Sequence, residues 1–246
     1  MIRLDAATVL LQWSTGGLLF GWYTNRNRDV GPGYAKLLRL VYATFAIAAV
    51  VCGVRYGVVL VREIAAGALA LVALATYRNT TPHRDLIAPV LGAVGLIAAG
   101  IVAVRDAGSF DVAVSLARVL VGAAFLGSVS DAMLLGHWYL VQPGMPRRLI
   151  NELITAVLWV WPAEIIVLLL PTGMVSVLNG SIDDGWNGVL GWFWLASAIV
   201  TGILVVVTRA ALKERSYSAV MAATGLMYLA ILTAFCTDIV ARALLA

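Results

Sequence analysis

Long apolar segments alternate with short polar connectors along the whole of this chain. A helix that crosses a membrane needs about 20 mainly apolar residues, because the hydrocarbon layer is about 30 Å thick. Eight segments fit that pattern: 4–23, 37–57, 60–77, 86–104, 112–141, 149–171, 186–208 and 217–243. The pattern predicts an all-α, polytopic transmembrane helical bundle of eight spans. It forms one transmembrane domain over residues 1–246, with no soluble domain.

The second and third segments leave an alternative open. Arg55, Arg62 and Glu63 occupy the short stretch between them and leave little room for a turn. If residues 37–77 formed a single tilted or broken span, the total would be seven.

The composition agrees with a surface that faces lipid, since 62% of the residues are hydrophobic and only 12% are charged. The formal net charge of +4 does not indicate nucleic acid, because the basic residues are scattered between apolar segments. The expected partners are the lipid bilayer and either other membrane subunits or further copies of the chain.

Basic residues also predict the orientation, because cytoplasmic loops of membrane proteins carry an excess of Lys and Arg. Eleven of the 17 lie on the connectors after the first, third, fifth and seventh segments. They are Arg26, Arg28, Lys36, Arg39, Arg78, Arg84, Arg147, Arg148, Arg209, Lys213 and Arg215. We therefore expect a multi-pass protein of the cell membrane with both termini outside the cytoplasm, although Arg3 lies on the outer side.

A short sequence similarity suggests an internal duplication. Residues 18–23 read Leu-Leu-Phe-Gly-Trp-Tyr and residues 134–139 read Leu-Leu-Gly-His-Trp-Tyr, and a Pro-Gly loop follows each. One interpretation is a four-plus-four parallel repeat with halves 1–108 and 109–246. The alternative is an interfacial aromatic belt that recurs at two helix ends.

Ionisable residues within apolar segments are the main candidates for a functional site, because charge is unfavourable in the hydrocarbon layer unless it is paired or hydrated. Arg118 and Glu164 lie at similar depths on neighbouring segments, so an ion pair is expected. Asp238 and Arg242 would complete the cluster. It would act as an ion or proton gate, or as a salt bridge that only clamps helices.

A second polar group is expected nearer the cytoplasmic side. His137 should lie level with Asn151 and Glu152, and a hydrogen bond between His137 and Glu152 would make a proton entry point. Asp131 would be the next station of a relay, although it is about 120° from His137 around the helix. In the alternative, Asp131 bonds only to Ser128 or Ser130.

Two tryptophans lie close to the proline of the sixth segment. Pro162 should kink that helix just before Glu164, and Trp159 and Trp161 flank it. With Trp138 they could stack a planar ligand such as a quinone, or they could form an interfacial girdle.

These patterns favour a non-enzymatic membrane protein. The leading hypothesis is a proton, ion or small-molecule pathway, or an integral subunit of an energy-coupling complex such as a respiratory one. The rivals are a redox subunit that binds quinone or a single haem near His137, and a purely structural assembly subunit. Nucleotide, zinc-protease and serine-hydrolase motifs are absent, so no catalytic or metal residue is assigned.

Overall fold

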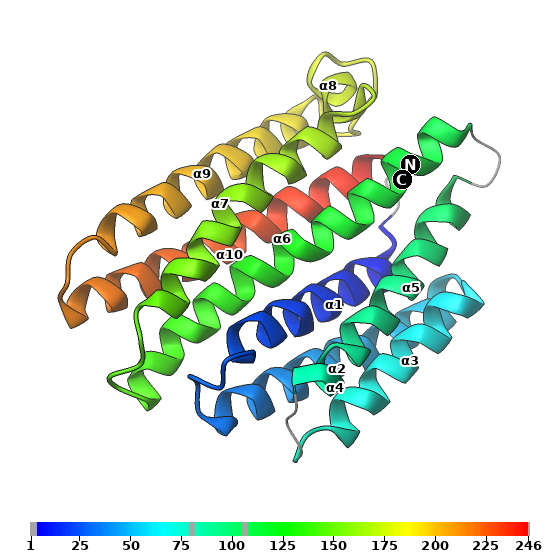
Figure 1. Cartoon of the computed structure of the whole chain (residues 1–246). Helices are drawn as coiled ribbons and strands as arrows, with labels where there is room; N and C mark the ends of the chain where they lie inside the picture. Colours follow the sequence, from blue (N-terminus) through cyan, green and yellow to red (C-terminus); the bar gives the residue numbers. More distant parts are fainter. Residues whose placement is uncertain (1–3, 79–81, 105–107, 246) are drawn as a thin grey trace.

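The computed structural model describes residues 4–78, 82–104 and 108–245. Within these ranges every regular element is a helix, and eight long helices form the bundle in Figure 1. The long helices are α1 (Ala6–Asn25), α2 (Pro32–Tyr56), α3 (Leu60–Ala75), α5 (Ile87–Ala103), α6 (Ser109–Val141), α7 (Arg148–Leu169), α9 (Val189–Ala211) and α10 (Tyr217–Leu245). The short helices α4 (Pro82–Asp85) and α8 (Gly173–Leu178) lie in connectors. The predicted helical bundle is confirmed, with one long helix for each apolar segment.

Six candidate spans are long and apolar enough to cross a bilayer: α2, α5 together with the preceding residues from His83, α6, α7, α9 and α10. The chain is therefore an integral membrane protein. The expected count of eight spans goes beyond this finding, because α3 has only 16 residues and α1 carries polar residues such as Gln12, Ser14 and Thr15. Most of α1 is buried among its neighbours rather than facing outward.

Residues 37–77 form two helices, α2 and α3, rather than one, and of these only α2 is long enough to count as a span. Two of the three charged residues at this turn, Arg62 and Glu63, stabilise it. Arg62 donates to the carbonyl of Gly57 at 2.7 Å, and Glu63 accepts from the amide of Val59 at 3.0 Å. Arg62 also pairs with Asp5 of α1 at 2.6 Å.

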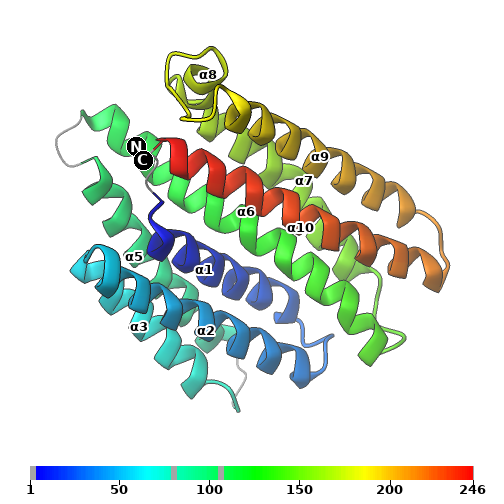
Figure 2. The same cartoon turned by 180° about the vertical axis from the view of Figure 1, so that it is seen from behind.

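The helices pack as two rings of four. In the first ring α1 contacts α2, α2 contacts α3, α3 contacts α5, and α5 returns to α1. The second ring follows the same order with α6, α7, α9 and α10. The two rings meet mainly where α1 and α6 lie side by side, as both views of the bundle show (Figures 1 and 2).

Small residues let α1 and α6 approach closely. A Cβ at Gly16 would overlap the carbonyl of Ala123, and a Cβ at Gly127 would overlap the backbone of Gly16. Close packing through small residues is typical of membrane helices, which have no hydrophobic drive toward each other in lipid. Gln12 also donates to the carbonyl of Val119 at 2.9 Å. The two helices run parallel, because residue numbers rise together from the Gln12–Val119 contact to the Gly16–Gly127 contact.

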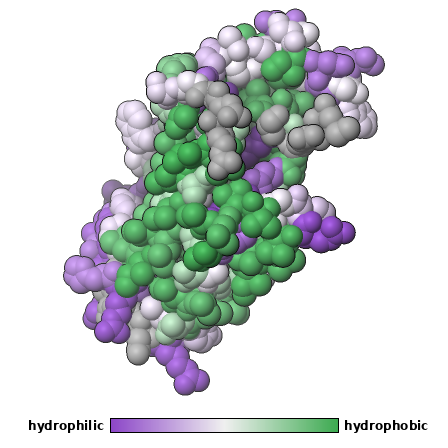
Figure 3. Space-filling model, turned by 90° about the vertical axis from the view of Figure 1, so that its right-hand side faces the viewer, coloured by the Kyte–Doolittle hydropathy of each residue, from purple (hydrophilic) through white to green (hydrophobic). Residues whose placement is uncertain are grey.

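Both termini lie at one end of the bundle, which we call the terminal end and which includes Asp5 and Leu245 (Figure 1). The opposite end holds the connectors after α1, α3, α6 and α9, and we call it the basic end. Figure 3 shows hydrophobic residues over the middle of one face, with hydrophilic residues toward both ends. This distribution suits a chain whose middle faces acyl chains.

Candidate functional site

The terminal half of the bundle contains a buried charged cluster beside Gly122 of α6. Arg242 donates from Nε to both carboxylate oxygens of Asp238, at 2.8 and 2.9 Å, and from Nη2 to the carbonyl of Arg118 at 2.8 Å. A Cβ at Gly122 would lie 2.5 Å from Gln12 Nε2 and 2.9 Å from Asp238 Oδ1. The missing side chain at Gly122 therefore lets α1, α6 and α10 bring these groups together.

Glu164 of α7 faces this cluster and is 0% exposed. Both of its carboxyl oxygens are buried, and neither receives a hydrogen bond from an N–H or hydroxyl donor in the part of the chain that the structure describes. The charged groups that act on it are Asp238, Arg242 and Arg118. Two buried carboxyl groups thus compete for Arg242, and a buried charge without close pairing is strongly unfavourable.

The expected ion pair between Arg118 and Glu164 is wrong. Among the described residues, Arg118 instead donates to the carbonyls of Val167, at 3.2 Å, and Leu170. The carbonyl of Val167 would normally accept from the amide four residues later, but that residue is Pro171, which has no amide hydrogen. Arg118 thus satisfies the end of α7, where carbonyls are left without helical partners.

A cavity of about 130 Å³ adjoins this cluster at the terminal end. Its polar wall consists of Asp5, Thr8, Ser115, Arg118 and Arg242. The side chain of Asp5 is 54% exposed, so the cavity reaches the surface beside it. The cluster therefore has a route toward the terminal end.

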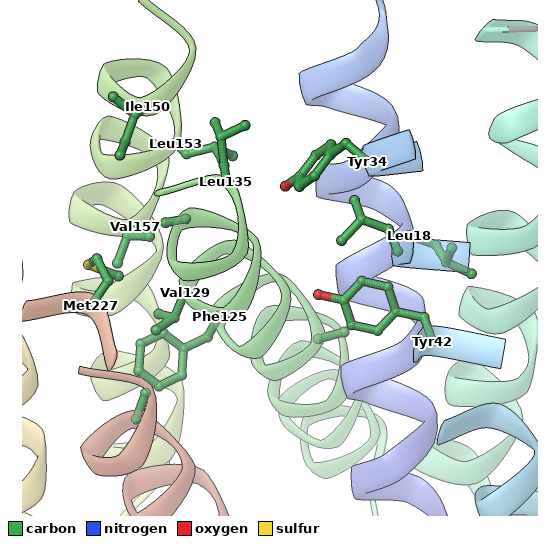
Figure 4. Packing of buried hydrophobic residues seen from close by; sticks show 14 of the residues in the cluster. Leu18, Tyr34, Tyr42, Phe125, Val129, Leu135, Ile150, Leu153, Val157 and Met227 are labelled. Carbon is green, nitrogen blue, oxygen red and sulfur yellow. The ribbon is translucent and has the colours of Figure 1, made fainter. Parts of the chain in front are cut away.

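A second buried carboxyl group, Asp131 of α6, lies in the basic half of the bundle and is 0% exposed. Its Oδ1 accepts a hydrogen bond from the hydroxyl of Tyr42, which also lies 3.0 Å from the hydroxyl of Ser130. Its Oδ2 has no partner. Tyr34 donates to the carbonyl of Asp131 at 3.3 Å, and Figure 4 shows both tyrosine hydroxyls pointing toward α6.

Both tyrosines come from α2, which reaches α6 across α1. The ring of Tyr42 lies on Gly17, where any Cβ would overlap it. Ser14 fixes the same position by donating to the carbonyl of Tyr42 at 2.7 Å. The alternative in which Asp131 bonds only to neighbouring serines is wrong, because Ser128 and Ser130 donate to α6 carbonyls and Tyr42 supplies the bond.

The expected hydrogen bond between His137 and Glu152 is also wrong. Glu152 pairs with Arg26 at 2.8 Å and with Arg148 at 3.4 Å. A carboxylate gains more from two guanidinium groups than from one imidazole at the same edge. His137 is exposed, with its ring edge-on to Tyr228 of α10 at 6.4 Å.

Asn151 does not join a relay either. Its side chain is exposed and donates to the carbonyl of Arg147 at 2.9 Å. Of the four residues expected in the relay, only Asp131 is buried beside other polar groups in the interior.

The three tryptophans expected to stack a ligand have different surroundings. Trp161 donates to the carbonyl of Ala198 at 3.0 Å and lies on Gly202 of α9. Trp159 is 76% exposed, since two residues along a helix turn a side chain by about 200°. Trp138 lies at the basic end against Tyr34, 5.8 Å between ring centroids.

Sequence reasoning missed three residues of these sites: Gln12, Tyr34 and Tyr42. The available signal was in the first apolar segment, where Gln12, a serine, a threonine and two glycines follow one another closely. A polar, glycine-rich stretch inside a span indicates a helix that is enclosed by protein. No comparable signal marks the tyrosines of α2.

No group of three or more His, Cys, Asp or Glu side chains that could hold a metal ion occurs among residues 4–78, 82–104 and 108–245. Comparison with known protein families, curated proteins and solved structures gave no match. The functional argument therefore starts from the geometry of the two buried carboxyl sites.

Proposed function

We propose that this integral membrane protein carries protons across the bilayer through buried carboxyl groups beside the α1–α6 interface. The outer site is Glu164 with Asp238 and Arg242, and the inner site is Asp131. The observation that carries the proposal is Glu164 itself, which is fully buried, receives no hydrogen bond from an N–H or hydroxyl donor of the described residues, and lies beside the carboxylate of Asp238 with Arg242 shared between them.

The charges of the outer site explain how a proton would bind and leave. With Asp238 paired to Arg242, Glu164 is stable only when protonated. If Arg118 released the carbonyls of Val167 and Leu170 and turned toward Glu164, the carboxylate would gain a counter-ion and the proton could leave. Arg118 is placed for this role because it lines the cavity that reaches the terminal end.

The two sites are separated where α1 and α6 touch. Gly16 contacts Ala123 and Gly127 closely enough to exclude even a methyl group. Transfer between Asp131 and the outer site therefore requires the two helices to separate at this contact. The proposal accordingly includes a movement of one ring against the other.

We also infer that the two rings are parallel repeats, with halves 1–108 and 109–246. The support is that both rings follow the same order of contacts and that α1 runs parallel to α6. Transporters built from parallel repeats bind their substrate at the interface between halves. The buried carboxyl groups lie beside that interface.

A proton flux assay tests the function directly. The purified protein is reconstituted in liposomes that contain a pH-sensitive dye, and a potassium diffusion potential drives proton entry. Wild type should acidify the lumen, and Glu164→Gln should abolish the flux while its thermal unfolding stays close to that of wild type. The control is Asp183→Asn, which neutralises an exposed loop carboxylate. Full flux in Glu164→Gln would end the proposal.

The redox hypothesis has weaker support in the described residues. His137 is exposed against Tyr228, while His83 lies on α4, which packs on α5 and α1 of the other ring. An absorption spectrum of the protein purified from its native membrane separates the two functions. A Soret band that His137→Ala removes would favour haem.

A further inference from the structure

A small cavity lies at the basic end between α1, α2 and α4. It measures about 20 Å³ and is lined by Gly21, Trp22, Asn25, Arg39 and Asp85, with Leu18, Ala35 and Leu38. A water molecule needs about 10–15 Å³ on the same measure, together with two to four polar partners. The cavity therefore has room for one water molecule.

Unpaired polar groups surround this cavity. Trp22 Nε1 and Arg39 Nη1 are buried donors that find no partner among the described residues. The other terminal nitrogen of Arg39 pairs with Asp85 at 2.5 Å, and the two side chains are only 6% and 13% exposed. Two free donors and a carboxylate in one place form a site for a small polar molecule.

The same cavity approaches Asp131 through Gly21. A Cβ at Gly21 would lie 3.5 Å from Oδ2 of Asp131, the oxygen that has no partner, and 2.7 Å from Cδ1 of Leu38. Gly21 and Leu38 therefore line the cavity on the side of this carboxyl group, and the absence of a side chain at Gly21 leaves the approach to Oδ2 open.

We propose that this cavity binds a water molecule that connects Asp131 to the basic end, and that the Arg39–Asp85 ion pair is its gate. Its place in transport rests on the proposed function above. The cavity water passes a proton to Oδ2 of the Asp131 carboxylate and takes one from a hydronium ion at the basic end, so that it remains a neutral water molecule. The polar groups that face Asp131 are Tyr42 and Tyr34 from α2 and Ser130 on its own helix.

The ion pair suits a gate because it joins two elements and is buried. Arg39 belongs to α2 and Asp85 to α4, so opening requires α4 to move away from α2. Separating buried charges is strongly unfavourable, so the closed state dominates. The exposed His137, expected from the sequence to be the entry point, is replaced in this role by Arg39 and Asp85.

Hydrogen–deuterium exchange of the Asp131 carboxyl group tests the route without any transport measurement. Infrared spectra of the reconstituted protein contain carbonyl bands of protonated carboxyl groups, which shift in D₂O as the acidic proton exchanges. The band missing in Asp131→Asn belongs to Asp131, and the band missing in Glu164→Gln belongs to the outer site.

Opening and narrowing the route should have opposite effects on the Asp131 band. Asp85→Asn removes the gate and should speed exchange about tenfold, equivalent to about 1.4 kcal/mol in the barrier. Gly21→Ala should slow exchange, because the new methyl group fills the space beside Leu38. The matched control is Arg148→Gln, which breaks an exposed ion pair with Asp29 at the same end and should leave the rate unchanged.

If Asp85→Asn does not fold because Arg39 is left unpaired, the double variant Arg39→Gln/Asp85→Asn removes both charges and should also speed exchange. Unchanged exchange in the gate and Gly21→Ala variants would overturn the proposal. Slower exchange in His137→Ala would overturn it too, because the route would then run past His137. If the Asp131 proton exchanged as expected but the protein conducted no protons, the proposed gate would stand and the proposed transport function would be wrong.

Discussion

The hydroxyl of Tyr42 donates a hydrogen bond to Asp131 across the bare face of α1 at Gly17. The helices α1, α2 and α6 meet at this point, and they can do so because residue 17 has no side chain. Any Cβ at Gly17 would occupy the volume of the Tyr42 ring. The buried carboxyl group of α6 therefore depends on a donor from α2 that does not belong to its own ring.

Gly17→Ala should lower the free energy of unfolding by about 1–3 kcal/mol, the usual effect of overpacking a well-filled interior. Thermal unfolding in detergent measures the loss. The matched control is Gly67→Ala on α3, where a Cβ would meet nothing within 4 Å. That variant should gain up to about 1 kcal/mol, because alanine favours the helix more than glycine does. A Gly17→Ala protein as stable as wild type would contradict the packing described here.

Exchanging the charges of Arg118 and Glu164 should not restore stability. Arg118→Glu removes the donors that satisfy Val167 and Leu170, at about 1.5–3 kcal/mol for hydrogen bonds from a charged group. Glu164→Arg adds a second cation beside Arg242. The double variant should therefore unfold at a lower temperature than either single variant. Recovery to wild-type stability would show that Arg118 and Glu164 are paired after all.

The connector before α9 should lose its order in acid. Burial alone would raise the pKa of Asp184, but hydrogen bonds from the amides of Gly188, Trp186 and Leu190 together hold it below its ordinary value of 3.8. Because the folded pKa is the lower one, the carboxylate stabilises the connector above the ordinary value, and this contribution is lost as the pH falls through the folded pKa.

Amide hydrogen exchange over residues 184–191 measures this change, after correction for the intrinsic pH dependence of exchange. Protection should fall as the pH drops below about 4. Asp184→Asn should show low protection at every pH, since its NH₂ group turns a donor toward the amides. The stabilisation of this connector by Asp184 would be contradicted if the wild-type connector resisted cleavage by pepsin at the lowest pH.

Impermeant thiol labelling of cells tests the orientation. In a background with Cys52 and Cys236 replaced by alanine, Ser181→Cys at the terminal end should react in intact cells. Glu214→Cys at the basic end should react only after permeabilisation, because basic loops face the cytoplasm. The reverse pattern would place the termini in the cytoplasm.

The apolar pattern located the helices well but could not decide how many are exposed to lipid. Each long helix coincides with a predicted segment because length and hydropathy are local properties of the chain. The mean hydropathy of α1 combines residues in two environments. Its polar residues and glycines face protein, whereas others such as Leu19 remain 37% exposed. A segment average contains no information on which face is covered.

The site was predicted in part. Asp131, Glu164, Asp238 and Arg242 were chosen because a charge within an apolar segment is unfavourable unless it is paired or hydrated. The three carboxyl groups are fully buried, and the side chain of Arg242 is 12% exposed. Arg118 was assigned to the wrong partner. Depth along a helix can be counted from the sequence. That the carbonyl of Val167 lacks a helical partner, and that Arg118 reaches it, depends on the end of α7 before Pro171 and on which helix lies opposite.

The sequence by itself determined that the chain is a helical membrane protein with a few ionisable residues in apolar surroundings, because burying a charge or a backbone amide in lipid is so unfavourable that both leave a local pattern. Only the tertiary structure decided which of those residues share a partner. Tyr42 reaches Asp131 across Gly17, which has no side chain, and Glu164 faces Arg242, which is already paired with Asp238. Such pairings depend on helix rotation and on contacts between distant segments, which no local pattern specifies.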